Sequence, residues 1–153
     1  MRPIEHTFWQ AYLESLPQKS LPLNPFVEAS PAGNIDTTDG LIDLYLAGKK
    51  TAGSSLVEDF EVEGDPLPKV GNYWIVLNSQ NKPMLILKTI KVEIHLFNDV
   101  PEYIAKAEGE GDCSLEYWRK VHIKFFSPYL ASWHLKRIDD AHVVTEFLEI
   151  VWQ

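Results

Sequence analysis

A lysine pair in the segment Gly48-Lys49-Lys50-Thr51 carries the clearest chemical signal of the chain. Gly48 falls where a predicted helix commonly ends with a left-handed residue. A lysine just beyond a helix end stabilises the helix dipole, and this structural role is the simpler interpretation. A lysine held beside a cavity can instead bind phosphate, or lose its proton through desolvation and act as a base.

Hydroxyl side chains follow the lysine pair at Thr51, Ser54 and Ser55. Alternate residues of a strand share a face, so Lys50 and Ser54 are expected to point the same way if this segment is extended. A hydroxyl beside an unprotonated lysine can act as a nucleophile. Serine and threonine in strands are more often ordinary residues of the polar face, and the spacing leaves both interpretations open.

A glutamate in the predicted strand 84–97 is the candidate partner of the lysine. One side of this strand carries apolar residues and is expected to be buried: Ile90, Val92, Ile94 and Leu96. Glu93 lies on the other side, between Lys91 and His95. Its ordinary role there is a charge pair across strands. If that side lines a cavity, Glu93 instead pairs with Lys50 or acts as a general base.

The known motifs for metals, nucleotides and ordinary serine hydrolases are absent. The chain has no HExxH, GxxxxGK[ST], GxGxxG or GxSxG pattern, so we expect no metal and no cofactor. Its five histidines show no ligand spacing, and His122 is expected to be a core residue of its helix. The single cysteine excludes an internal disulfide and favours a reducing, cytoplasmic location.

Charge and hydropathy restrict the partners. The formal net charge of −8 argues against a broad surface that tracks nucleic-acid backbones, so DNA is not expected, although a local basic cleft is compatible with it. Acidic runs within 58–65 and 108–116 are expected to be solvated loops. No signal peptide or membrane-spanning run is visible, so no membrane association is expected.

The helices and strands that must position these residues are predicted from the spacing of apolar residues and from the positions of proline and glycine. We expect helices at 4–16, 37–47, 101–107 and 114–126, strands from 51 and at 73–77, 84–97 and 143–152, and an extended proline-rich segment at 17–33. This order predicts an α+β domain with a mostly antiparallel sheet or small β-barrel and helices outside. In the last helix, Tyr117 and Arg119 either make local contacts or offer a stacking surface and a phosphate contact.

Several segments together resemble the ASCH domain family. They are Tyr45–Leu56, Gly71–Leu77, Lys91–Ile94, Ala107–Asp112, and Ser114–Arg119 with His122. The resemblance covers roughly residues 35–152. It implies a PUA-like fold, a small mostly antiparallel β-barrel with flanking helices, over residues 35–153. Residues 1–34 are then an N-terminal helix and a proline-rich segment that wraps the same domain.

The resemblance also implies an association with RNA. Some family members resemble ribonucleases, and one branch contains amidohydrolases that act on N4-acetylcytidine through a G-x-K-x-x-T motif and a strand glutamate. Gly48 and Lys50 match that motif and Glu93 matches the glutamate, but Gly53 stands where the threonine is expected. Thr51 or Ser54 is the available replacement for its hydroxyl.

Three functions are therefore carried forward. The first is a binding or processing domain for RNA or a modified nucleoside, including metal-independent ribonuclease activity. The second is an amidohydrolase of acylated cytidines, and the third is a non-catalytic protein-interaction domain. The predicted catalytic residues are Lys50, Glu93, Thr51 and Ser54. The predicted ligand-binding residues are Tyr45, Lys49, Tyr117 and Arg119.

Overall fold

The computed structural model describes all residues, 1–153, and shows an α+β fold. The helices are α1 (Pro3–Ser15), α2 (Thr38–Leu46), α3 (Val57–Glu63), α4 (Glu102–Glu108) and α5 (Leu115–Phe126). The strands are β1 (Val27–Pro31), β2 (Ala52–Leu56), β3 (Tyr73–Leu77), β4 (Pro83–Leu96) and β5 (His142–Trp152). Short 3-10 helices are η1 (Gln18–Ser20), η2 (Phe97–Asp99), η3 (Ser127–Tyr129) and η4 (Ile138–Asp140).

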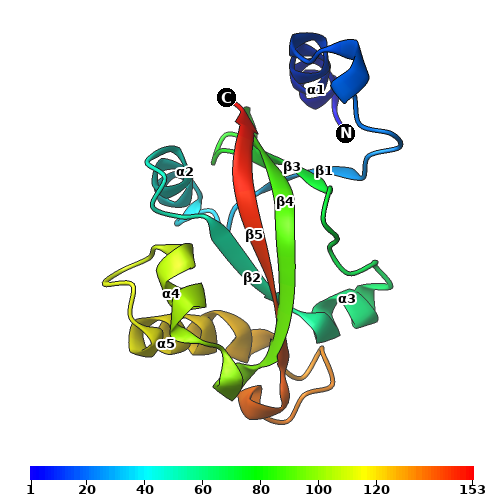
Figure 1. Cartoon of the computed structure of the whole chain (residues 1–153). Coiled ribbons are helices and arrows are strands. Elements are labelled where there is room, and N and C mark those ends of the chain that lie inside the picture. Colours follow the sequence, from blue (N-terminus) through cyan, green and yellow to red (C-terminus); the bar gives the residue numbers. More distant parts are fainter.

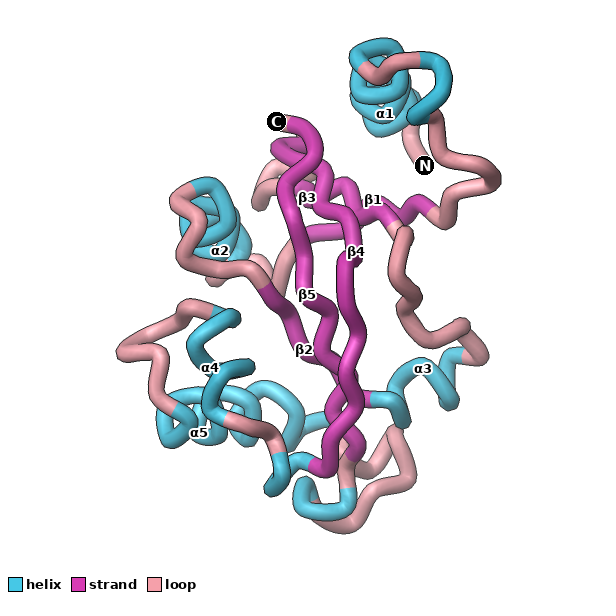
Figure 2. Tube along the Cα trace, in the orientation of Figure 1, coloured by secondary structure: helices cyan, strands magenta, loops and turns pink.

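One curled sheet of five strands forms a half-barrel, in the order β1-β3-β4-β5-β2. The pair β1–β3 is parallel, and the other three pairs are antiparallel. The predicted small, mostly antiparallel barrel with flanking helices is confirmed as a half-barrel, open between the edge strands β1 and β2. The strands lie at the centre of the molecule with the helices around them (Figures 1 and 2).

Two segments differ from the sequence-based expectation. The proline-rich segment contains β1, which pairs with β3 and is therefore part of the sheet rather than only a wrapping loop. The acidic run after β2 forms α3, which ends at Gly64 in the left-handed conformation. Helix α3 begins directly after β2. Glu58 and Asp59 lie in its first turn, where their negative charges interact favourably with the helix dipole.

In the second half of β4, the apolar side was predicted to be buried, and this prediction was wrong. Ile90, Ile94 and Leu96 are 48%, 49% and 43% exposed. The register with β5 shifts between Thr89 and Lys91, which leaves Ile90 as an extra residue in the strand. Such a bulge changes which side of the strand faces the core. On the polar side, the Glu93 side chain is only 16% exposed and accepts a hydrogen bond from Tyr103 of α4.

Three apolar clusters hold the helices on the sheet. Helices α4 and α5 pack around Phe97, Ile104 and Trp118. Helix α2 contributes Ile42 and Tyr45 to a second cluster with strand residues. Helix α1 contributes Trp9 and Tyr12, which contact Tyr73 edge-on or tilted. Full burial of a large apolar side chain contributes about 1.5–3 kcal/mol, so α1, α2, α4 and α5 are held mainly by these contacts.

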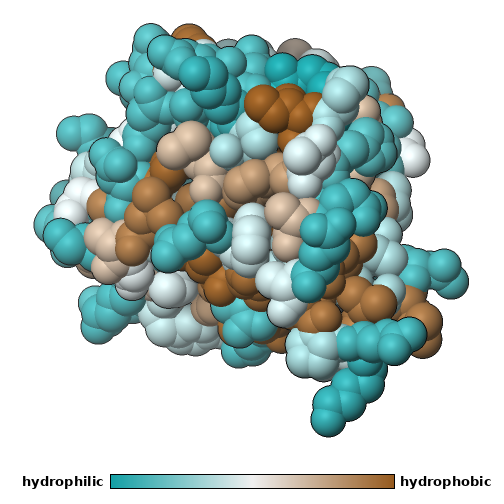
Figure 3. Space-filling model, turned by 90° about the horizontal axis from the view of Figure 1, so that it is seen from above, coloured by the Kyte–Doolittle hydropathy of each residue, from teal (hydrophilic) through white to brown (hydrophobic).

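The surface is mixed in polarity. Seen from above, hydrophobic residues are scattered among hydrophilic ones (Figure 3). No helix has the combined length and apolar character needed to cross a bilayer.

The connection from α4 to α5 lies directly against the end of α2. Gly109 has a φ of 64°, and a Cβ on it would stand 1.9 Å from the Lys49 carbonyl oxygen. The Thr51 amide donates a hydrogen bond to the Ala107 carbonyl at 2.7 Å. Because residue 109 is a glycine, the two backbones can approach closely enough to bring Glu108 and Glu110 to Lys50.

We predict that Gly109→Ala destabilises the protein well beyond the cost of a left-handed alanine, which is about 1–2 kcal/mol. The added methyl group would have to move a backbone carbonyl. Gly64→Ala is the matched control, since Gly64 has a φ of 75° with no atom within 4 Å of an added Cβ. Urea unfolding of both variants measures the difference, and equal losses would contradict the close approach.

Candidate functional site

The end of α2 fixes the position of Lys50. Gly48 has the predicted left-handed conformation, with a φ of 71°. The amides of Lys49 and Lys50 both donate to the Leu44 carbonyl, at 3.0 and 3.1 Å. This turn directs Lys50 inward, where its side chain is only 5% exposed, while Lys49 stays exposed.

The Lys50 ammonium is surrounded by acceptors from the α4–α5 connection. Its Nζ atom lies 3.0 Å from Glu110 Oε2, 3.6 Å from Glu108 Oε1 and 3.4 Å from the Glu108 carbonyl oxygen. It also lies 5.6 Å from the centroid of the Tyr45 ring. Two carboxylates and an aromatic ring therefore replace the water that this cation loses on burial.

Glu108 is the centre of the arrangement, with a side chain only 3% exposed. Its Oε2 atom accepts hydrogen bonds from the Trp118 indole and from Ser54 Oγ, the latter at 3.2 Å. His122 Nε2 lies 3.6 Å from the same oxygen. We call this set the Glu108 cluster: Lys50, Ser54, Glu108, Trp118 and His122.

The Glu108 cluster keeps its carboxylate ionised. Burial alone would raise the pKa of Glu108, but the hydrogen bond and charge of His122, the Lys50 ammonium and the Trp118 indole together hold it below its ordinary value. The pKa of Tyr45 is raised by its burial and by the charges of Glu108 and Glu110. Tyr45 therefore remains a neutral phenol beside the lysine.

Helix α5 supplies the other side of the cluster. Trp118 and His122 are four residues apart, and their rings stack at a centroid distance of 4.0 Å. His122 Nδ1 lies 2.7 Å from the Trp118 carbonyl oxygen, so a proton on Nδ1 is donated to it. The expectation that His122 is buried is confirmed, and the structure adds its contact with Glu108.

Ser54 joins the cluster to the sheet. Its hydroxyl lies 2.8 Å from Thr145 Oγ1 on the neighbouring strand β5. The predicted common face of Lys50 and Ser54 is confirmed, because both contact the Glu108 carboxylate. Gly53, on the opposite face, has only the Tyr45 hydroxyl within 4 Å of an added Cβ, at 3.5 Å.

Glu93 does not pair with Lys50, and that expectation was wrong. Its carboxylate contacts the Lys91 ammonium and the Tyr103 hydroxyl, and lies 3.8 Å from His95 Nε2. The hydrogen bonds from Lys91 and Tyr103 lower its pKa. Thr145 lies on β5, the strand between β4 and β2. It pairs with Glu93 of β4 on one side and with Ser54 of β2 on the other. Thr145 thus separates Glu93 from the Ser54 end of the cluster.

Three other residues predicted for the site, Thr51, Tyr117 and Arg119, lie outside the Glu108 cluster. Thr51 is exposed, and its hydroxyl donates to the Ala107 carbonyl at 3.2 Å. Tyr117 packs over Gly111 and borders a small cavity of about 10 Å³ beside Glu108 and Glu110. Arg119 is separate from the cluster, because its guanidinium donates to the Asn98 carbonyl at 3.0 Å.

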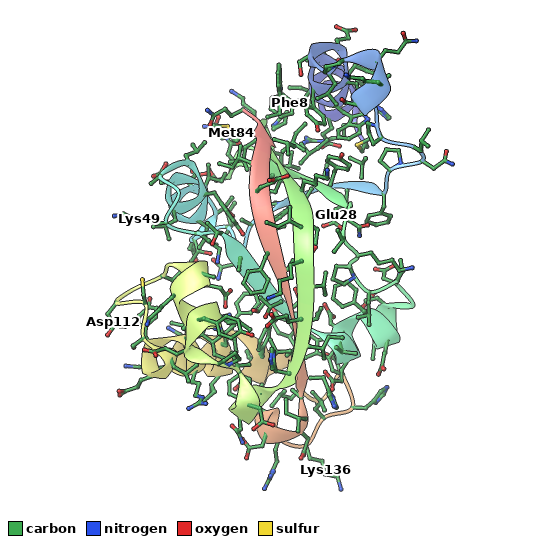
Figure 4. All side chains as sticks on the ribbon, viewed as in Figure 1. Phe8, Glu28, Lys49, Met84, Asp112 and Lys136 are labelled. Atoms are coloured by element: carbon green, nitrogen blue, oxygen red, sulfur yellow. The ribbon has the colours of Figure 1, made fainter.

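Lys49 lies at the outer end of α2, on the same side of the molecule as Asp112 of the α4–α5 connection (Figure 4). No three side chains of histidine, cysteine, aspartate or glutamate come together as a potential metal site. The cluster is thus built from a lysine, a carboxylate, a hydroxyl, an indole and an imidazole.

Sequence reasoning missed Glu108, which it assigned to a solvated acidic run. The usable signal was helical spacing, since Glu108 follows the apolar Ile104 by four residues and therefore shares its face. Ile104 is fully buried, and Glu108 is 2% exposed.

The fold and site define a small half-barrel domain with a buried lysine–glutamate centre. The family model of the ASCH domain matches residues 29–152. The chain therefore belongs to the ASCH domain family, a family of PUA-like fold that is generally linked to RNA binding.

Two solved structures are similar over nearly the whole chain. The ASCH domain from Lactobacillus crispatus JV V101 has a TM-score of 0.92 and 29% identity, covering 100% of this chain and 97% of the other. Protein EF3133 from Enterococcus faecalis V583 has a TM-score of 0.83 and 34% identity, covering 99% of this chain and 90% of the other. A search among curated proteins found no match.

We predict that Glu108→Gln lowers the free energy of unfolding by about 3–5 kcal/mol at pH 7, because it removes the buried negative charge and leaves the Lys50 ammonium with only the partly exposed Glu110. Glu110→Gln is the matched control. The Glu110 side chain is 25% exposed, so its loss is expected to cost about 1 kcal/mol or less. Equal losses in urea unfolding would show that Glu108 is not the main partner of the lysine.

The same variant tests the ionisation of Glu108. A carboxylate with a lowered folded pKa stabilises the protein above its unfolded value, near 4.5, and this contribution disappears as the pH falls through the folded pKa. The stability difference between wild type and Glu108→Gln should therefore shrink below about pH 4.5. A difference that stays constant down to pH 3 would contradict an ionised Glu108.

Proposed function

We propose that this domain binds RNA fragments or a modified nucleoside at Lys50 and processes the bound molecule with the Glu108 cluster. The observation that carries the proposal is the contact of one buried carboxylate with both the Lys50 ammonium and the Ser54 hydroxyl. A cation that is ion-paired to a carboxylate, and a hydroxyl that donates to the same carboxylate, are the parts that hydrolytic chemistry needs without a metal.

Charge favours a nucleoside or a short fragment over a long RNA. The chain has a formal charge of −8. Glu108 and Glu110 both lie within 4 Å of the Lys50 ammonium and would repel a phosphate at short range. A phosphate would have to displace Glu110, whereas a neutral base or acyl group needs only a hydrogen bond from Lys50.

For cleavage of RNA, Glu108 would accept the proton of the attacking 2′-hydroxyl, and Lys50 would stabilise the charge on the phosphorane oxygens. Lys49 is exposed at the same junction and is available for a neighbouring phosphate. Tyr117 is 37% exposed beside the cavity that Glu110 borders, so it can stack on a base.

Amide hydrolysis is the second candidate, and Ser54 favours it. The hydroxyl missing at Gly53 is present one residue later, 3.2 Å from Glu108. In this reaction Ser54 Oγ attacks the acyl carbonyl carbon and its proton passes to Glu108. Lys50 stabilises the oxyanion, and the amino group of the base leaves with the proton. Water then releases the acyl group from Ser54.

We predict that Ser54→Ala abolishes hydrolysis of a panel of N4-acylated cytidines, because it removes the nucleophile. Lys50→Arg, which keeps a positive charge, should lower kcat about 100-fold through a misplaced oxyanion contact. Glu93→Gln is the matched control and should stay within about three-fold of wild type, since Glu93 does not contact Lys50. Thermal melting of each variant separates lost chemistry from lost folding.

Parallel assays with labelled RNA in EDTA distinguish the remaining functions. If Ser54→Ala still cleaves RNA and Lys50→Arg does not, the result supports the ribonuclease form of the proposal. If wild type neither binds nor alters RNA or any acylated nucleoside, the hydrolytic proposal fails. A protein-interaction domain would then be the better account of the fold.

A further inference from the structure

A hollow of about 390 Å³ opens beside the C-terminal end of β2, which is an edge strand of the sheet. It lies between α3 and the segment that follows α5, drawn in orange below α3 in Figure 1. Its size is in the usual range of small-molecule sites. We call it the aromatic hollow and define it by Leu56, Asp59, Glu63, Phe125, Tyr129 and Trp133.

The aromatic walls are fixed by mutual contact. The rings of Tyr129 and Trp133 are 5.4 Å apart, and those of Phe126 and Trp133 are 5.9 Å apart at 70°. Phe125 contacts Phe126 at 5.5 Å. Phe125 and Tyr129 are nevertheless 42% and 52% exposed, so parts of their rings remain open to a ligand. The hollow therefore offers preformed aromatic surface rather than a gap that side chains must rearrange to open.

The charged groups of the hollow are all negative. Asp59 and Glu63 line it, and no lysine, arginine or histidine does. The Trp133 indole donates to Asp59 Oδ1 at 2.6 Å, which holds this carboxylate at the wall and leaves Oδ2 without a hydrogen bond. Glu63 is exposed at the last position of α3. A phosphate or carboxylate ligand would be repelled here, whereas a cation would be attracted.

We propose that the aromatic hollow binds a small organic cation, an alkyl- or arylammonium with an apolar body. The ammonium faces Asp59 and Glu63, and the apolar part packs on the rings of Phe125 and Tyr129 through cation–π and hydrophobic contacts. Ser54 borders this hollow and also contacts Glu108, but the hollow has the opposite charge preference from a phosphate site. The ligand, which carries a positive charge, is therefore distinct from the anionic RNA or the neutral nucleoside of the proposed function.

A charge series on one ring tests this assignment in the full-length protein. Benzyltrimethylammonium, benzyl alcohol and benzoate are titrated at 150 mM salt, with Trp133 fluorescence, isothermal calorimetry and amide NMR shifts as readouts. We expect the cation to bind at least ten-fold more tightly than benzyl alcohol and benzoate not to bind. The NMR shifts should centre on residues 54–63 and 125–133.

Variants locate the site. The double change Asp59→Asn with Glu63→Gln should weaken the cation at least ten-fold, and Tyr129→Ala about three-fold. Glu61→Gln removes the same charge from α3 outside the hollow and should leave the affinity within two-fold of wild type. A cation that binds no more tightly than benzyl alcohol, or that loses equal affinity in Glu61→Gln, would overturn the proposal. Loss of hydrolytic activity in Ser54→Ala bears on the proposed function alone and leaves this test unaffected.

Discussion

The buried contact between Glu108 and Lys50 is the interaction on which the rest of the site depends. A carboxylate and an ammonium that are both about 95% buried would each be strongly unfavourable alone. They are tolerated because the carboxylate also accepts hydrogen bonds from Trp118 and Ser54. Since an apolar pair of similar volume is often at least as stable, the contact is better explained by a requirement for charge at this position than by stability.

This contact also explains the backbone around it. Glu108 reaches Lys50 only because Gly109 lets the α4–α5 connection pass against the Lys49 carbonyl. Gly48 in turn sets the direction of Lys50 at the end of α2. Two left-handed glycines, 61 positions apart in the sequence, therefore determine one ion pair. Helices α4 and α5 must then pack closely on β2, which places Trp118 and His122 on the remaining sides of the carboxylate.

The local sequence pattern was sufficient to predict the Lys50 side of the site and insufficient to predict the Glu108 side. The helix end at Gly48 and the shared face of Lys50 and Ser54 follow from backbone geometry, and both were predicted from the sequence. The burial of Glu108 depends on a lysine 58 positions away, so an acidic run appeared solvated until the fold was known. The buried side of β4 was predicted wrongly because one extra residue at Ile90 exchanges its sides, and no local pattern marks that bulge. Glu93 does not reach Lys50 because Thr145 of β5 lies between Glu93 and Ser54.

The distribution of charge limits how this domain recognises a ligand. Lys50 already has two carboxylates within 4 Å, and the nearby aromatic hollow has only carboxylates. Apart from the exposed Lys49, neither region presents the unpaired cations that hold a phosphate backbone. Affinity must therefore come from aromatic contacts and directed hydrogen bonds, which depend on the shape of a ligand more than on its charge. Ser54 borders both regions, because it lines the aromatic hollow and its hydroxyl contacts Glu108. This distribution of charge supports the proposed preference for a nucleoside or a short fragment over a long RNA.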